Sequence, residues 1–393
     1  MVSKYYRNRS NITSLQPTYN ICKFCAKRND PTTKFKIYYS ITNAYNEDLY
    51  GINKCFICRG LFTLINKIVK DIIYITTIRN KYEFRSYFLG SSIPASLFDN
   101  EDHFRSIFKI RGRENIKSAF NKQIRDISKK NLKKLLQPIK PDLMINLSIL
   151  DNFEILIDLK PRSYYLIMRY TKKKFMTQNI KYLDSDKSES KGHIDEYSNH
   201  KISIETIVKK KLLKVTDSKD IKFTWIGAED PNSLVLGKGR FFIAEIIAPQ
   251  KRRINTNQVF KEDGIIFRIE EKRESIKKFN VNYISKIRAY VQTLNPITSQ
   301  KLSLLRQLNN TVVTYRYKSK IVQKKIYKIC AKKLDEYHFV VTFLADGGLF
   351  IKQFIEKQMF ASNSLVSHMD NNCACIKFDI LGIYLKNDRI NDF

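Results

Sequence analysis

Apolar residues recur at helical spacing in the first half of the chain. Between residues 114 and 136 they stand three or four positions apart, at Ile116, Phe120, Ile124 and Ile127. This spacing predicts a helix with one buried face. The β-branched run at 72–77 predicts a strand instead. We therefore expect an α+β domain over residues 61–180.

Residues 181–201 interrupt this pattern because they are polar, charged and nearly free of large aliphatic side chains. Such a composition is typical of a linker, so we expect a domain boundary there. Beyond it the pattern predicts helices over 204–213 and 299–308, and strands over 223–226, 241–247, 264–269, 338–344 and 378–385. The alternation indicates an α+β domain over residues 202–393, built on a large mixed or antiparallel sheet.

The 393-residue chain has a formal net charge of +33, from 71 Lys and Arg against 38 Asp and Glu. A charge of this size indicates a polyanionic partner. We find no uninterrupted apolar run of membrane-spanning length and no secretory signal, so nucleic acid fits better than a membrane. We expect a soluble, cytoplasmic protein.

The sequence contains four short basic runs, at 129–134, 172–175, 209–214 and 251–253. Each run alone is typical of a solvated surface. Together they predict a groove that binds phosphates over a wide footprint. Arg169, Lys172 and Lys251 are the individual candidates for contact with an RNA backbone.

Four of the seven cysteines form two Cys-x2-Cys pairs, Cys22 with Cys25 and Cys55 with Cys58. Four thiolates complete the tetrahedral coordination of zinc, so the pairs predict a structural Zn2+ site without an open position. The alternative is four ordinary buried thiols. With the metal, residues 1–60 would form a small zinc-binding module in a reducing compartment.

An acidic turn follows the strand expected at 223–226. Gly227 permits a tight turn, and Glu229 and Asp230 come directly before Pro231, which disfavours a helical conformation at Asp230. The sequence thus presents a carboxylate at the end of a strand, a common place for a catalytic acid. A solvated turn would explain the same residues.

Several segments together resemble a known family. Around the acidic turn they are 227–230, 233–241 and 249–252, and elsewhere they are 83–90, 114–121, 141–142, 169–178, 348–355 and 375–381. With the paired cysteines, nearly the whole chain resembles the tRNA pseudouridine synthases that modify uridines 54 and 55 in archaea. The resemblance implies a THUMP-containing RNA-binding domain within residues 61–180 and a pseudouridine synthase fold within 202–393.

The resemblance also implies a mechanism, in which Asp230 attacks the target uridine covalently. The base is then released, turned and rejoined to the sugar through C5, without an organic cofactor. Replacing the neighbouring Glu229 by Gln should matter far less. Arg240 would orient a phosphate or Asp230.

Two aromatic positions near the base also follow from the resemblance. The first corresponds to Tyr283, Ile287 or Tyr290, between which our alignment does not decide, and the second to Phe350, where relatives carry tyrosine. A phenylalanine keeps the stacking face and lacks the hydroxyl. We therefore expect Tyr283 or Tyr290, together with Phe350, in the substrate site.

The implied partner is tRNA, with no membrane and no obligate protein partner, and we expect a monomer. The rival hypothesis is a catalytically weak or inactive tRNA-binding protein of the same family. An RNA methyltransferase or thiouridylase is disfavoured because the sequence has no Gly-x-Gly-x-x-Gly cofactor loop or Gly-rich phosphate loop in a strand-to-helix setting.

Overall fold

The computed structural model describes residues 19–29, 55–179, 202–227, 229–276, 282–317, 320–356 and 364–385. The chain divides into two compact units, Met1–Arg162 and Ser163–Phe393. This division comes earlier in the chain than the boundary that we expected at 181–201. The segment 181–201 itself lies outside the described residues. The division comes earlier because strand β5 (Tyr164–Lys172) pairs on both sides with strands of the second unit.

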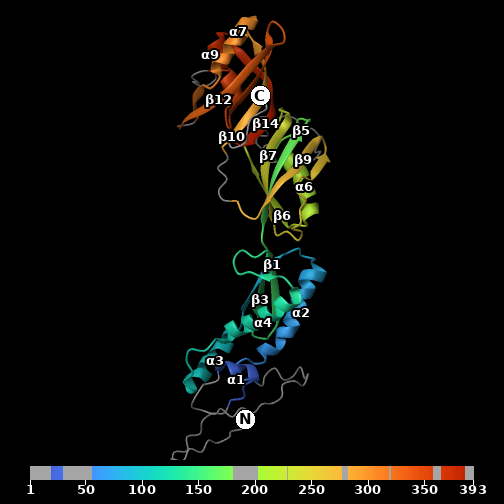
Figure 1. Ribbon diagram of the computed structural model, residues 1–393, viewed down its shortest axis with the longest axis vertical. Coiled ribbons are helices and arrows are strands. Elements are labelled where there is room, and N and C mark those ends of the chain that lie inside the picture. The colour runs from blue at the N-terminus through green and yellow to red at the C-terminus, as the bar shows by residue number, and fades with distance from the viewer. Residues whose placement is uncertain are drawn as a thin grey trace, which may run out of the picture. The chain divides into compact units, whose positions relative to one another are not determined.

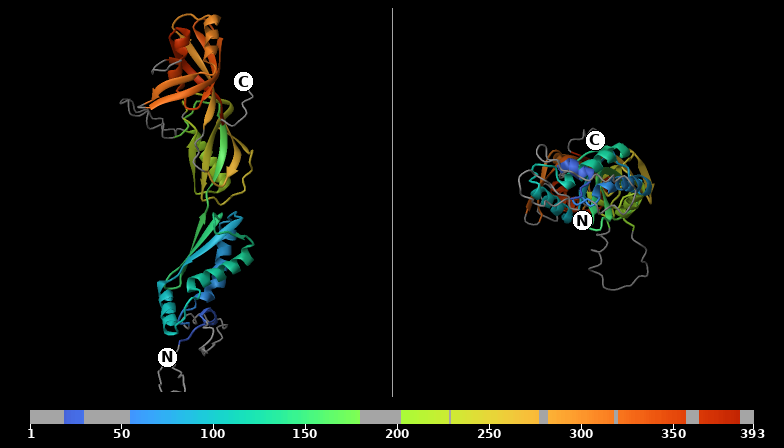
Figure 2. Two further views of the ribbon diagram at one scale, coloured as in Figure 1. Left: turned by 60° about the vertical axis from the view of Figure 1, so that its left-hand side comes forward. Right: turned by 90° about the horizontal axis from the view of Figure 1, so that it is seen from below.

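The first unit packs helices against a small sheet. Its elements are α1 (Lys23–Asn29), η2 (Leu61–Leu64), α2 (Ile65–Ile73), η3 (Tyr74–Arg79), β1 (Ser86–Ser92), α3 (Ala95–Ile107), α4 (Ile116–Leu132), β2 (Leu135–Leu136), β3 (Leu143–Ile149) and β4 (Ile155–Pro161). Among the described residues the sheet has four strands in the order β2-β1-β3-β4. Only the β3–β4 pair is antiparallel. Helices α2 and α4 pack against each other along this sheet (Figures 1 and 2).

The helix expected within 114–136 is confirmed as α4, and Asn115 caps its start by accepting a hydrogen bond from the Ser118 amide at 2.8 Å. The strand expected at 72–77 is wrong. Helix α2 continues there into the π-helix η3, because its apolar residues recur at helical spacing and bury one face. The Thr76 hydroxyl, which is buried, donates to the Ile72 carbonyl at 2.7 Å and so needs no partner outside the helix.

The described residues within 1–60, which are 19–29 and 55–60, share a core with the rest of the first unit. Cys25, Cys55 and Cys58 belong to the same buried cluster as the strands and helices of the first unit, including Leu89 and Phe120. These described residues belong to the first unit, and the zinc-binding module at 1–60 stays a prediction.

The second unit is dominated by one large sheet. Its strands are β5, β6 (Asp220–Trp225), β7 (Val235–Ile247), β8 (Val259–Glu262), β9 (Ile265–Arg273), β10 (Tyr283–Thr293), β11 (Val312–Tyr317), β12 (Lys320–Lys333), β13 (His338–Asp346) and β14 (Cys373–Leu385). Its helices are α6 (Ile204–Thr216), α7 (Ser299–Leu304), η4 (Leu305–Leu308), α8 (Ile351–Glu356) and α9 (Leu365–Met369). All five strands and both helices that the pattern predicted are confirmed, and so is the α+β class.

The described part of this sheet has ten strands in the order β11-β12-β13-β10-β14-β7-β5-β9-β8, with β6 paired to β7. Every pair is antiparallel except β14 with β7, so the sheet is mixed. Figure 1 shows α6 beside β9 and β6, and α7 and α9 beside β12. Within the described ranges, no helix combines the length and the apolar character that crossing a membrane requires.

Candidate active site and metal centre

Asp230 lies in the connection between β6 and β7, close behind the end of β6. Its side chain closes a turn by accepting a hydrogen bond from the Asn232 amide at 3.0 Å, while its carbonyl accepts from the Ser233 hydroxyl at 2.7 Å and the Ser233 amide at 3.0 Å. Such side-chain turns are a common use of aspartate before proline. The hydrogen bond from the Asn232 amide holds the carboxylate in place. The Asp230 side chain is 23% exposed, so the carboxylate is also accessible.

Lys352 of α8 meets this carboxylate, with its Nζ 3.0 Å from Asp230 Oδ2. Burial alone would raise the pKa of Asp230, but the Asn232 amide, Lys352 and Lys172 outweigh it and hold this pKa below its usual value. The hydrogen bond to Asp230 in turn raises the pKa of Lys352. Asp230 is therefore a carboxylate at neutral pH, which is the form that a nucleophile needs.

The loop before α8 carries an exposed aromatic side chain. Phe350 is 37% exposed, two residues before Lys352, and its ring meets the edge of Tyr315 at 5.5 Å between centroids. The Tyr315 hydroxyl donates to the Gly348 carbonyl at 2.9 Å and so fixes this loop. The location of Phe350 beside the candidate nucleophile stays a prediction.

Tyr283 is the tyrosine of β10 that lies at the Asp230 turn. A Cβ added at Gly227 would stand 2.4 Å from the Tyr283 hydroxyl, and one at Gly347 would stand 2.3 Å from its ring, so both glycines are required by close approach. Ile287 is buried in the core. Tyr290 stands seven residues further along β10, where its ring lies under Lys377 at 4.6 Å. The structure thus does not bring Tyr290 to the turn.

Directly behind Asp230, its neighbour Glu229 is buried among polar side chains. Lys172 forms an ion pair with Glu229 Oε1, the Tyr170 hydroxyl donates to Oε2, and Arg240 NH1 lies 3.3 Å from Oε2. The Gln178 amide donates to the Tyr170 hydroxyl at 3.4 Å. Our sequence reasoning missed this cluster and also missed Lys352, although each of these residues lies in a segment that carried the resemblance to the synthases.

One predicted role in this region is wrong, and only one of the two alternatives for another fits the structure. The Lys172 side chain is 0% exposed and cannot contact an RNA backbone. Arg240 is also buried and donates to the carbonyls of Ile226 and Gly227, each at 2.7 Å, so its contacts fit the alternative that it orients the Asp230 turn and not the alternative that it orients a phosphate. Lys172 was misassigned because its charge was given more weight than its position along the strand.

The other two candidates for RNA contact differ from each other. Arg169 is largely enclosed, since its guanidinium donates to Glu270 at 2.8 Å and to the Ile383 carbonyl at 2.8 Å. The Arg169 side chain thus links β5 to β9 and β14. Because its guanidinium is occupied by these contacts, a phosphate contact is disfavoured. Lys251 is 51% exposed, and its nearest acid, Asp217, is 3.8 Å away. Lys251 therefore fits the predicted contact.

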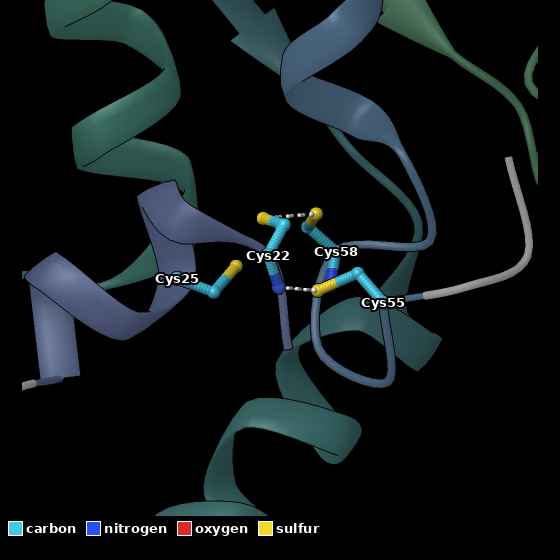
Figure 3. A group of neighbouring side chains, drawn as sticks. All are labelled: Cys22, Cys25, Cys55 and Cys58. Carbon is cyan, nitrogen blue, oxygen red and sulfur yellow. Dashed lines mark hydrogen bonds between the residues drawn. The ribbon is translucent and has the colours of Figure 1, made fainter. Parts of the chain in front are cut away.

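In the first unit the four paired cysteines converge on one point (Figure 3). Their Sγ atoms all lie within 4.8 Å of one another, and those of Cys22 and Cys58 are 3.6 Å apart. Tetrahedral zinc with Zn–S bonds of about 2.3 Å places its sulfurs roughly 3.8 Å apart, so the spacing matches. The four thiols can hold one metal ion.

Hydrogen-bond donors surround the sulfurs. The amides of Cys22 and Cys58 donate to Cys55 Sγ at 3.3 and 3.5 Å, and Arg28 donates to Cys25 Sγ at 3.7 Å. Hydrogen bonds among the four thiols lower the pKa values of Cys22 and Cys55 and raise those of Cys25 and Cys58. Such outer contacts orient metal ligands and offset their charge.

Comparison with curated proteins finds relatives over most of the chain. A protein of Nitrosopumilus maritimus named "tRNA pseudouridine synthase Pus10" is 28% identical over 94% of this chain and 96% of its own length. Proteins of the same name from Methanocaldococcus jannaschii and Methanosphaera stadtmanae are 27% and 24% identical, over 85% and 98% of this chain and 76% and 100% of their own lengths.

Among solved structures, one from the crystal structure of a Cbf5-Nop10-Gar1 complex matches with a TM-score of 0.27 and 10% identity, over 44% of this chain and 43% of that chain. This likeness is too low to support an argument. The family model described as "Pus10, C-terminal" matches residues 165–384. That range contains Asp230, Lys352 and nearly all of the large sheet, and it exceeds half of the chain. The protein therefore belongs to the Pus10 family.

Proposed function

We propose that the protein is a tRNA pseudouridine synthase that isomerises uridine to pseudouridine with Asp230 as its nucleophile. The observation that carries the proposal is the carboxylate of Asp230, kept ionised by Lys352 and the Asn232 amide at an accessible turn. The relatives named tRNA pseudouridine synthases support the same reaction. A catalytically inactive tRNA-binding protein would not need a carboxylate held in this way.

In the proposed reaction the Asp230 carboxylate forms a covalent bond to the target nucleotide. The bond between N1 of the base and the sugar breaks, the base turns, and a bond from C5 to the sugar forms. The bond to Asp230 also breaks, which releases the nucleotide and restores the carboxylate. The proton of C5 leaves and N1 gains one, so atoms balance without a cofactor. A covalent intermediate divides one hard step into easier ones, and the uridine must first leave its stack to reach the site.

The side chains around Asp230 have distinct roles in this proposal. Lys352 holds the carboxylate in place and keeps it ionised. The half-exposed ring of Phe350 offers a stacking face to the extruded base, and Tyr283 packs behind the turn. Phe350 supplies no hydroxyl, so base contacts there would be by stacking alone.

We further propose the T-arm of tRNA, at uridine 54, 55 or both, as the place of modification, and the cytoplasm as the compartment. The net charge of +33 supports binding to the phosphate backbone, with exposed Lys251 among its contacts. The first unit would serve as the THUMP-like RNA-binding part. Its four cysteines would hold a structural Zn2+ with a closed coordination shell.

The experiment that tests the function is incubation of the protein with an unmodified tRNA transcript, followed by chemical mapping of pseudouridine. We expect pseudouridine at position 54, 55 or both, without any added cofactor. Binding of the transcript without any pseudouridine would instead favour the inactive tRNA-binding protein.

The contact between Lys352 and Asp230 predicts a change in the pH dependence of the reaction. Because Lys352 lowers the pKa of Asp230, Lys352→Met should raise that pKa. The rate at saturating enzyme rises with pH as Asp230 ionises. In Lys352→Met the acidic limb of this pH profile should therefore move to higher pH, and the rate should fall most at acidic pH. Single-turnover rates measured across pH test this, with the exposed lysine Lys261→Met as the control. An unmoved acidic limb would contradict the assigned role of Lys352.

A further inference from the structure

Glu229 occupies an unusual place for an acid beside a candidate nucleophile. Its side chain is 1% exposed and both of its oxygens face donors, Lys172 at Oε1, and Tyr170 and Arg240 at Oε2. Burial and the neighbouring Glu229 raise the pKa of Tyr170 well above its usual value, so the tyrosine remains a donor. Glu229 therefore acts as a shared acceptor at the centre of the cluster.

The two cations that Glu229 binds also hold the backbone on both sides of Asp230. Arg240 NH2 donates to the carbonyls of Ile226 and Gly227 at 2.7 Å each, before Asp230. Lys172 Nζ donates to the carbonyl of Pro231 at 3.4 Å, directly after it, and to that of Met176 at 2.7 Å. The Met176 amide in turn donates to the Pro231 carbonyl at 3.2 Å.

From these contacts we propose that Glu229 is a positioning residue: through Lys172 and Arg240 it fixes the turn that aims the Asp230 carboxylate. The inference rests on the proposed synthase function and adds a residue to it. It also reverses the expectation that a substitution at Glu229 should matter little. Asp230 reaches solvent, but the backbone on each side of it is anchored to a buried ion cluster.

The chemistry of the cluster explains why glutamine cannot replace glutamate. A carboxylate accepts hydrogen bonds at both oxygens, whereas an amide presents one NH2 group that can only donate. In Glu229→Gln that NH2 group would face either Lys172 or the pair formed by Tyr170 and Arg240. Two buried cations would also lose their counter-charge, which is strongly destabilising when only one partner is removed.

The test is the single-turnover rate constant with enzyme in saturating excess over tRNA transcript. A smaller folded fraction does not change this rate constant at saturation, so loss of stability alone leaves it unmoved. A misplaced nucleophile lowers it, and we expect a fall of about 100-fold for Glu229→Gln. The matched control is Glu245→Gln on β7, which also removes a carboxylate that accepts from a tyrosine, Tyr165 at 3.3 Å.

A double variant, Glu229→Gln with Lys172→Met, keeps the test decisive where the single variant folds poorly. It removes one cation together with the anion and so preserves the net charge of the cluster. The hydrogen bond from Lys172 to the Pro231 carbonyl is lost, however. We expect its rate constant to be low as well. A folded single or double variant with the wild-type rate constant would overturn the proposal.

Hydrogen exchange gives a readout that does not depend on activity. The amides of Asn232 and Ser233 are bonded to Asp230, so Glu229→Gln should speed exchange in the peptide that covers 229–234. Unchanged protection there would contradict the proposal even with no turnover to measure. A wild-type protein that forms no pseudouridine would instead contradict the proposed function, and exchange would still decide the role of Glu229.

Discussion

Asp230→Asn should lower pseudouridine formation by at least about 1,000-fold, because an amide cannot act as the carboxylate nucleophile. The change keeps the shape of the side chain, and its oxygen can still accept from the Asn232 amide at the turn. It also removes a negative charge from a surface that binds a polyanion, so tRNA affinity should not fall. The measurement is the single-turnover rate alongside the dissociation constant for the same transcript.

Asp220→Asn is the matched control for this prediction. Asp220 opens β6, and it also pairs with a lysine, Lys209. The change in charge is the same in both variants, and we expect the control to retain the wild-type rate. Conversion by Asp230→Asn at more than a trace of the wild-type rate would show that another group is the nucleophile.

The periodicity of the sequence predicted most of the second unit and part of the first. Strands were found wherever apolar residues formed short runs, as in β7 and β13, because burial in a sheet selects such runs. The same rule failed at 72–77, where β-branched residues continue the buried face of α2. Local preference for a strand was outweighed there by tertiary packing, which a short window of sequence does not contain.

The site was predicted to the extent that it is local in sequence. The order of Gly227, Asp230 and Pro231 indicated the turn, whereas Lys352 reaches it from a segment more than a hundred residues later. Lys172 was misinterpreted although a signal existed. Buried positions alternate along β5 through Leu166, Met168 and Tyr170, and Lys172 is the next position on that inward face.

This alternation has a general consequence for basic proteins. A lysine at the inward position of a strand needs a buried acid, and the nearest one in space, Glu229, is 57 residues away in the chain. Sequence alone does not show that Lys172 pairs with Glu229, nor how close this ion pair lies to the Asp230 carboxylate. The family resemblance marked both segments and did not say that they meet.

The second large effect is expected at the cysteine cluster, where Cys55→Ser should abolish stoichiometric metal binding and unfold the first unit at lower denaturant concentration. The reason is that Cys55 is buried in the core of that unit, so a metal bound by the four cysteines would tie the N-terminal segment to the sheet. Structural zinc contributes about 10 kcal/mol or more in small zinc peptides, and we expect a loss of at least about 3 kcal/mol in this larger core.

Metal analysis of the purified protein should find about one zinc ion per chain, as a closed site of four thiolates requires. Denaturant unfolding followed by hydrogen exchange separates the two units, and the peptides of β7 and β10 should remain protected in Cys55→Ser. Cys330→Ser, at an exposed cysteine of β12, is the control and should keep both zinc and stability. If a chelator removes no metal from the wild type and leaves the unfolding of the first unit unchanged, the four cysteines are ordinary buried thiols.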